Sequence, residues 1–357
     1  MVSKIFNKLI RLLKPDSMRL TNLWLILNLF LYYKITRLRI KRKAAKFNIL
    51  NLRTFKKKLD KEETVENCTI DKLDFKSNND LINKSSKILK NYGIVLIKNA
   101  FHKNEIETFL EAIEEISPKK KYHDNKIDHE YEISNNTIPI HKNKFLFDDR
   151  IIKTIENSCN DLNQNEKFKE KLYVRQMTKL IYFNTKKENI VNNWTAGWHI
   201  DFPTQFTAHV LLDDLNENQT RMQALPSSNL IPLIPSKHYF LEHLVLDKKR
   251  NILECCGPKG TLYIHSGNTL HRNFPIINTY RFVWSQVYTL DKIFFASEFS
   301  KKKRVFENSK NYIDNLTDYQ KEKIIPLIEY PKEFENKIFK YDNEKFFEKS
   351  KNDISYL

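Results

Sequence analysis

The stretch that decides the fold is Trp198-His199-Ile200-Asp201, read together with residues 261–281, TLYIHSGNTLHRNFPIINTYR. Successive side chains of a β-strand point to opposite faces, so residues two positions apart share a face. We therefore expect His199 and Asp201 to present an imidazole and a carboxylate side by side. If His271 arrives from a facing strand, the three side chains form a 2-His-1-carboxylate set. Such a set holds Fe(II) on one side and leaves the other positions open.

A cationic residue follows this stretch at a fixed distance. Arg281 stands ten residues after His271, inside the apolar run Tyr280-Arg281-Phe282-Val283-Trp284. A guanidinium in such a strand needs a planar anion, and it can hold a carboxylate through two hydrogen bonds. His265 is the alternative second histidine, because it too lies near the end of an apolar run. Arg281 would then follow it by 16 residues.

These motifs resemble the phytanoyl-CoA dioxygenase family of Fe(II)/2-oxoglutarate oxygenases. The family has His-x-Asp, a Pro-Gly-Ser-His-like turn, a glycine with apolar residues before the distal histidine, and an arginine about ten residues later. Here the corresponding residues are His199-Ile200-Asp201, Leu225-Pro226-Ser227-Ser228-Asn229, Gly260-Thr261-Leu262-Tyr263-Ile264, His271 and Arg281. Upstream, Gly93-Ile94-Val95-Leu96-Ile97 is similar to the opening strand of the family. The resemblance spans residues 85–290 and departs from the family at Ser227 and Asn229.

The resemblance carries implications for chemistry. It implies that Fe(II) is the cofactor and that 2-oxoglutarate and O2 are co-substrates. The family spacing favours His271 over His265 as the distal ligand. Arg281 would pair with the far carboxylate of 2-oxoglutarate, and Tyr182 and Asn273 are further candidates to contact it. Because Asp201 is retained, the resemblance implies a hydroxylase rather than a halogenase.

The pattern of predicted elements gives the fold class. Short apolar strands separated by turn signals occur throughout residues 172–290, which predicts a jelly roll or barrel. Helical spacing of apolar residues predicts helices at 81–91 and 103–116. We therefore expect a mostly β core with flanking helices (α+β), a cupin-like double-stranded β-helix. His209 lies on one of these strands, and we interpret it as filling space or facing solvent.

Positive charge is concentrated at the N-terminus. The net charge is +17, yet residues 1–59 hold 16 Lys or Arg and one acidic residue, and the remaining residues are close to neutral. This argues against a nucleic-acid groove in the core and for an anionic surface met by the N-terminus. We predict four segments: a basic membrane-associating segment at 1–59, a linker at 60–79, the oxygenase domain at 80–290 and a helical extension at 291–357.

The apolar run Leu20 to Tyr33 has three interpretations. Its 14 residues fall short of the ~20 that span a bilayer as a helix, and no small-residue cleavage site follows it. It is either an interfacial helix on anionic lipid, a segment packed on the domain or a partner, or a short span. The first interpretation predicts a cytoplasmic protein peripheral to the membrane. The four cysteines lack metal-binding spacing and fit a reducing compartment.

The predicted function is an Fe(II)- and 2-oxoglutarate-dependent dioxygenase that hydroxylates a small-molecule, lipid or lipid-linked substrate. Two alternatives from other classes are a non-catalytic cupin-like binding module and a membrane-surface scaffold with a relic barrel. A zinc hydrolase with the same ligands is a third alternative. Turnover of 2-oxoglutarate distinguishes the oxygenase from all of them.

Overall fold

The computed structural model describes residues 65–113, 131–133, 142–160, 172–174, 179–184, 197–201, 205–230, 252–290 and 316–328. Its α-helices are α5 (Asn78–Tyr92), α6 (Lys103–Ala112), α8 (Asp149–Asn160) and α12 (Asp318–Ile328), and its short 3-10 helices are η3 (Glu66–Cys68), η4 (Lys72–Asp74) and η10 (Ser228–Leu230). Its strands are β1 (Thr69–Asp71), β2 (Ile94–Lys98), β3 (Tyr131–Ile133), β4 (Tyr173–Val174), β5 (Lys179–Asn184), β6 (Gln205–Leu211), β7 (Arg221–Ala224), β8 (Leu253–Glu254), β9 (Leu262–Ser266), β10 (His271–Phe274) and β11 (Tyr280–Thr289).

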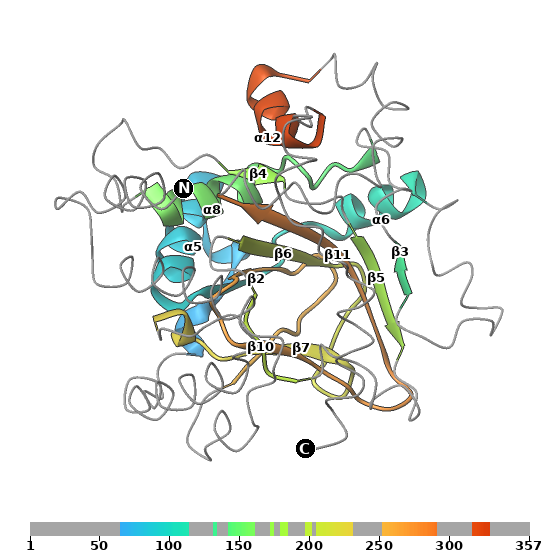
Figure 1. Cartoon of the computed structure of the whole chain (residues 1–357). Coiled ribbons are helices and arrows are strands. Elements are labelled where there is room, and N and C mark those ends of the chain that lie inside the picture. The colour runs from blue at the N-terminus through green and yellow to red at the C-terminus, as the bar shows by residue number, and fades with distance from the viewer. Residues whose placement is uncertain are drawn as a thin grey trace, which may run out of the picture.

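The strands form two sheets. The larger has the order β1-β2-β9-β6-β11-β5-β3, with β4 added to β11, and the smaller has the order β10-β7-β8. At the centre of the large sheet, β6 pairs antiparallel with both β9 and β11. Figure 1 shows β7 and β10 across from the large sheet, on the side away from α5, α6 and α8. The predicted fold class is confirmed: a mostly β double-stranded β-helix with flanking helices.

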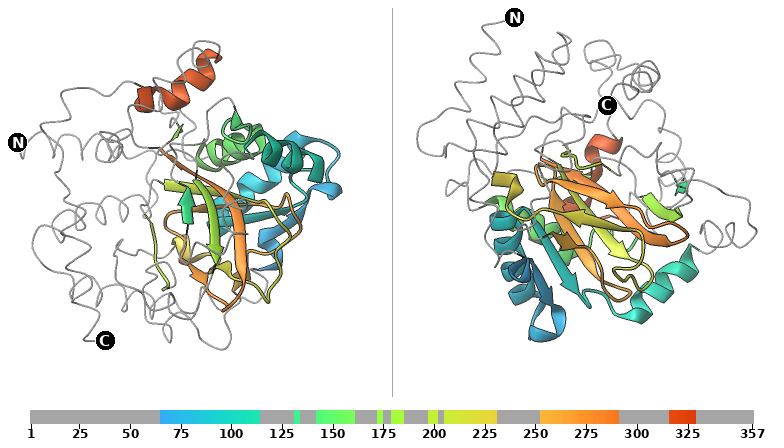
Figure 2. Two further views of the ribbon diagram at one scale, coloured as in Figure 1. Left: turned by 90° about the vertical axis from the view of Figure 1, so that its right-hand side faces the viewer. Right: turned by 90° about the horizontal axis from the view of Figure 1, so that it is seen from below.

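The outer face of the large sheet packs against the helical layer. On β11, the Trp284 indole donates to Asn143 Oδ1 at 2.9 Å, and its ring lies 5.6 Å from the Phe145 ring. The Tyr288 hydroxyl donates to the Leu146 carbonyl at 3.0 Å. Figure 2 shows the helices gathered along one side of the sheet. Because side chains alternate along a strand, Arg281 on β11 points to the opposite face, toward the small sheet.

A glycine turn brings β9 close to the segment that follows β2. Gly260 has φ +89°, and a Cβ at this position would lie 2.1 Å from the Phe101 carbonyl oxygen. The Phe101 amide donates to the Gly260 carbonyl at 3.0 Å. Both the backbone conformation and the close approach therefore require glycine.

The sheet begins before residue 80, where we predicted the start of the domain. β1 pairs in parallel with β2, with Thr69 opposite Leu96 and Asp71 opposite Lys98. The Asn99 side-chain amide donates to both carboxylate oxygens of Asp71, at 3.0 and 2.9 Å. The polar composition of 60–79 indicated a linker because an edge strand of three residues leaves little apolar pattern.

The predicted C-terminal extension contributes α12 to the described structure. The Tyr319 hydroxyl donates to Glu156 of α8 at 3.0 Å, and Lys323, 5% exposed, forms an ion pair with the same carboxylate. Among the described helices, none combines the length and apolar character that a bilayer span requires. The segment 1–59, on which the membrane predictions depend, lies outside the described residues.

Candidate metal centre

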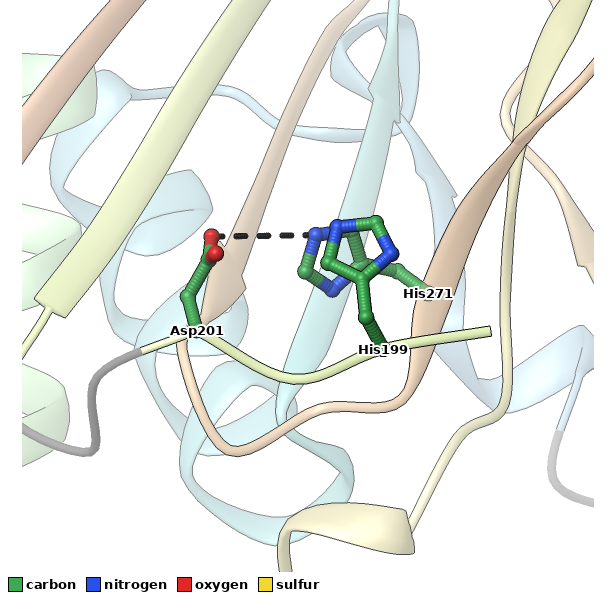
Figure 3. A group of neighbouring side chains, drawn as sticks. All are labelled: His199, Asp201 and His271. Atoms are coloured by element: carbon green, nitrogen blue, oxygen red, sulfur yellow. Dashed lines mark ion pairs between the residues drawn. The ribbon is translucent and has the colours of Figure 1, made fainter. Parts of the chain in front are cut away.

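The segment that contains His199 and Asp201 pairs with the start of β10, which contains His271. His199 and His271 are antiparallel bridge partners, and each backbone amide donates to the carbonyl of the other, at 2.9 and 3.0 Å. Two residues further along, the Asp201 amide donates to the Gly267 carbonyl at 2.7 Å. These backbone bonds fasten His199 and Asp201 beside the start of β10. Figure 3 shows the three side chains turned toward one another.

The three side chains lie close enough to share one ion. One ligand atom from each residue lies within 4.8 Å of the others. His271 Nε2 is 3.7 Å from Asp201 Oδ2, drawn as the dashed line in Figure 3. The rings of His199 and His271 have their centroids 4.3 Å apart. Both imidazoles are buried, whereas Asp201 is partly exposed.

Backbone carbonyls set the tautomer of both histidines. His199 Nδ1 lies 2.7 Å from the Gly197 carbonyl oxygen, and His271 Nδ1 lies 2.8 Å from the Thr269 carbonyl oxygen. Since a carbonyl only accepts, each Nδ1 carries the hydrogen and each Nε2 keeps its lone pair. This is the arrangement that metal-ligating histidines adopt, with the other ring nitrogen held by a carbonyl or carboxylate.

Burial keeps the first imidazole neutral. Desolvation, followed by the nearby charge of His271, lowers the pKa of His199 to about 4, although Asp201 opposes this shift. A neutral imidazole is the form that binds a metal ion. The site therefore supplies two imidazole nitrogens and one carboxylate, which fit Fe(II).

A glutamine that the sequence analysis did not single out supports the carboxylate. Gln205, at the start of β6, donates through Nε2 to Asp201 Oδ2 at 3.0 Å and to Thr207 Oγ1 at 3.3 Å. Gln205 is buried, so its amide is held in place by the sheet. The only signal in the sequence was its position four residues after Asp201.

Arg281 is buried on β11 without a counter-ion among the described residues. It is 2% exposed, and neither its Nε nor its Nη1 has a hydrogen-bond acceptor in that part of the chain. A buried guanidinium without an acceptor is costly, so the arrangement suits a site that an anionic ligand completes. The predicted anion-binding arginine thus lies inside the fold, with two of its nitrogens unpaired as far as the structure describes the chain.

The structure places the remaining predicted residues on three strands. His265, the alternative ligand, is buried with its ring centroid 4.3 Å from that of His271, but it is not one of the three clustered residues. Asn273 is two positions from His271 on β10, so the two share a face. Tyr182 on β5 is opposite Phe282, and Phe183 is the register partner of Arg281. The roles of Asn273 and Tyr182 stay predictions.

Two further polar residues near Arg281 were missed. His209 and Tyr263 are register partners on β6 and β9, both are buried, and their rings stack with centroids 4.6 Å apart. We expected His209 to fill space or to face solvent. It is 7% exposed, so it does not face solvent, and its burial agrees with the first alternative. The positive charge of Arg281 acts on the titration of both side chains.

Comparison with known proteins gives one family and several remote structures. A model of the phytanoyl-CoA dioxygenase family matches residues 89–279. No curated protein matches the chain. The α-ketoglutarate-dependent epimerase SnoN of nogalamycin biosynthesis is 14% identical with a TM-score of 0.42, covering 59% of this chain and 81% of its own. EctD from S. alaskensis, solved with 2-oxoglutarate and 5-hydroxyectoine, is 16% identical with a TM-score of 0.40, covering 58% of this chain and 75% of its own.

The matched range contains the whole candidate metal set. Enzymes of this family use Fe(II) as cofactor with 2-oxoglutarate and O2 as co-substrates, and the two imidazoles and the carboxylate fit that ion. The match spans more than half of the 357 residues. The chain belongs to the phytanoyl-CoA dioxygenase family.

Proposed function

We propose that this chain is a hydroxylase whose Fe(II) is held by His199, Asp201 and His271. The observation that carries the proposal is the pairing of this clustered set with a buried arginine whose Nε and Nη1 have no acceptor among the described residues. Neither feature is explained by packing, because a chain that only needed a stable barrel would fill these positions with apolar side chains. Together they suit a metal ion and an anionic co-substrate that lie next to each other.

Iron bound here would supply O2 activation, coupling the oxidation of 2-oxoglutarate to succinate and CO2 with insertion of one oxygen atom into a C–H bond. The residues of the chain have narrower tasks. Three side chains hold the ion by one side, which leaves positions for co-substrate and O2. Arg281 would hold the far carboxylate, and Tyr182 and Asn273 are further predicted contacts. Burial of the imidazoles and of Arg281 limits access of water to the reacting groups.

The substrate is proposed to be a small molecule, a lipid or a lipid-linked compound. The lipid part of this proposal rests on residues 1–59, whose charge and apolar run favour contact with an anionic membrane surface. In this proposal the oxygenase domain lies at the cytoplasmic side of the membrane, with the N-terminal segment as its attachment and 291–357 as an extension.

To test this, the full chain is reconstituted with Fe(II), 2-oxoglutarate and O2 and incubated with each member of a library of metabolites and lipid extracts. Succinate release is measured in each case. We expect succinate release that needs all three components and rises with one class of substrate. The Asp201→Ala variant is the control and should release none. Absence of succinate with every substrate class would favour a binding module. Turnover with Zn(II) and without O2 would favour a hydrolase.

A further inference from the structure

The small sheet carries buried charge on the face that points away from the metal centre. Side chains alternate along β10, so Arg272 and Phe274 lie on the face opposite to His271. On β7, their register partners are Gln223 and Arg221. Here we call this side of the small sheet its outer face. Each of its two arginines is 7% exposed, so each guanidinium must be stabilised mainly by contacts within the protein.

Arg272 makes contacts in three directions. Its guanidinium carbon lies over the Trp198 ring, 4.8 Å from the ring centre, and also 4.8 Å from the centre of the Phe274 ring. Its Nε donates to Gln223 Oε1 at 2.8 Å. A guanidinium can stack on an aromatic face and donate hydrogen bonds in its own plane at the same time. Arg272 therefore joins β10 both to β7 and to the segment that contains Trp198.

The contacts continue from β7 to the third strand. Gln223 donates through Nε2 to Glu254 Oε1 on β8 at 2.7 Å, and the other carboxylate oxygen of Glu254 forms an ion pair with Arg221 Nε. The guanidinium carbon of Arg221 lies 4.9 Å from the centre of the Phe274 ring. One connected set of side chains thus spans the three strands of the small sheet, and Arg272 extends it to Trp198.

The stack of Arg272 on Trp198 lies behind the two imidazoles of the metal set. Trp198 immediately precedes His199, and Arg272 immediately follows His271. Neighbouring side chains of an extended chain point to opposite faces, so the imidazoles meet on one side of this pairing and the stack closes it on the other. His199 and His271 form an isolated bridge rather than part of a longer ladder. The stack therefore adds a second attachment, which opposes rotation of one segment against the other.

Packing alone does not account for a charge at this position. Trp198 is 1% exposed, and an apolar side chain could cover its ring without the cost of burying a guanidinium. The flat guanidinium has a fixed orientation, set by the bond to Gln223, whereas a flexible apolar chain such as methionine has several. Arg272 is thus suited to hold the Trp198 ring at one angle.

Arg221 provides the comparison within the same face. It is as buried as Arg272 and contacts the same Phe274 ring, and it forms its ion pair with Glu254. Its Nη1 donates to the Gln219 carbonyl at 3.2 Å, in the turn before β7. These contacts hold the small sheet together, but they do not extend to the segment that carries His199.

We propose that Arg272 is a positioning residue of the metal centre. Through its stack on Trp198 it holds the segment with His199 and Asp201 at a fixed angle to β10, so that these two ligands face His271 before an ion arrives. The inference rests on the proposed function, because it takes these three side chains as the ligands. Arg272 lies on the outer face, so it acts on the ion only through the position of the ligands.

The experiment uses Co(II) in place of Fe(II), because the visible absorption of Co(II) reports the number and arrangement of its ligands. The full-length proteins are wild type, Arg272→Met, Trp198→Leu, the double variant with both changes, and the matched control Arg221→Met. Co(II) affinity is measured by competition with a chelator, and the spectrum is recorded at saturating metal. Thermal unfolding of the metal-free proteins reports on stability separately.

We expect Arg272→Met and Trp198→Leu each to weaken Co(II) binding about tenfold and to change the spectrum at saturation. The double variant should bind no more weakly than the more affected single variant, because both changes break the same contact. Arg221→Met should lower the unfolding temperature, since Glu254 loses its ion-pair partner. It should keep the affinity and the spectrum of the wild type.

Wild-type affinity and spectrum in Arg272→Met would overturn the inference and leave the proposed function intact. Equal losses of affinity in Arg272→Met and Arg221→Met would also overturn it, because they would show a general effect of disturbing the small sheet. So would additive losses in the double variant, which would mean that Arg272 and Trp198 act separately. If Trp198→Leu fails to fold, the comparison of the two arginine variants decides. Failure of the wild type to bind Co(II) would overturn the proposed function itself.

Discussion

Gln205 offers a test of how the carboxylate ligand is held. Its Nε2 donates to Asp201 Oδ2 at 3.0 Å, and the same oxygen is the one nearest to His271 Nε2. Leucine has a similar size but no donor, so Gln205→Leu removes this bond together with the bond to Thr207 Oγ1. A hydrogen bond to a charged group contributes about 1.5–3 kcal/mol. At about tenfold per 1.4 kcal/mol, this predicts metal binding weakened about 10- to 100-fold.

The assay is the affinity for Mn(II) or anaerobic Fe(II), measured by competition with a chelator of known affinity. Gln286→Leu is the matched control: it is a glutamine on the neighbouring strand β11, it is also buried, and it donates to the Val287 carbonyl at 2.9 Å. The control should lower thermal stability and leave the metal affinity unchanged. Equal metal affinity in wild type and Gln205→Leu would refute the argument that this amide positions Asp201.

The remaining predictions concern the ligands, the arginine and the N-terminus. Asp201→Ala or His271→Ala should abolish turnover and sharply weaken iron binding in calorimetry, whereas His265→Ala should leave iron binding largely intact; the opposite pattern would make His265 the ligand. Arg281→Met should weaken 2-oxoglutarate binding by about 2–5 kcal/mol and leave the metal affinity unchanged. The stability of the metal-free protein should not fall, because methionine replaces a buried charge that has no partner among the described residues. Removal of residues 1–59, which hold a net charge of +15, should preserve succinate release but abolish cosedimentation with anionic vesicles, and equal binding by both forms would exclude the membrane proposal.

The sequence was sufficient to predict the residues whose spacing is fixed by strand geometry. His199 and Asp201 are two positions apart in an extended segment, which presents both side chains to one side. Gly260 marked the turn into β9, and its φ of +89° beside Phe101 explains why glycine stands there. The apolar run around Arg281 predicted burial, and the structure agrees, with the side chain 2% exposed.

The sequence could not predict His209 and Tyr263, because their strands are buried on both faces. In β6, which runs QFTAHVL, every residue is buried: one face looks toward the helices and the other toward the small sheet. The strand therefore lacks the alternation of polar and apolar residues that indicates which face of a sheet is exposed. Only the register of β6 with β9 and β11 shows that His209, Tyr263 and Arg281 share a face. That register is a long-range property.

Unpaired donors in the interior reduce stability, and their presence bears on how the site works. The unpaired donor atoms of His209, Tyr263 and Arg281 would gain partners from water if the barrel were open, and they have none among the described residues. Apolar packing around them, as with Tyr263 stacked on His209, keeps their positions fixed before any ligand arrives. A co-substrate that supplies acceptors then binds without reorganising the protein, which is the energetic advantage of a preorganised site. The same reasoning requires that 2-oxoglutarate with Mn(II) raise the unfolding temperature of the wild type more than Mn(II) alone does. It also requires that this extra rise shrink in Tyr263→Phe, where the ligand meets one donor fewer.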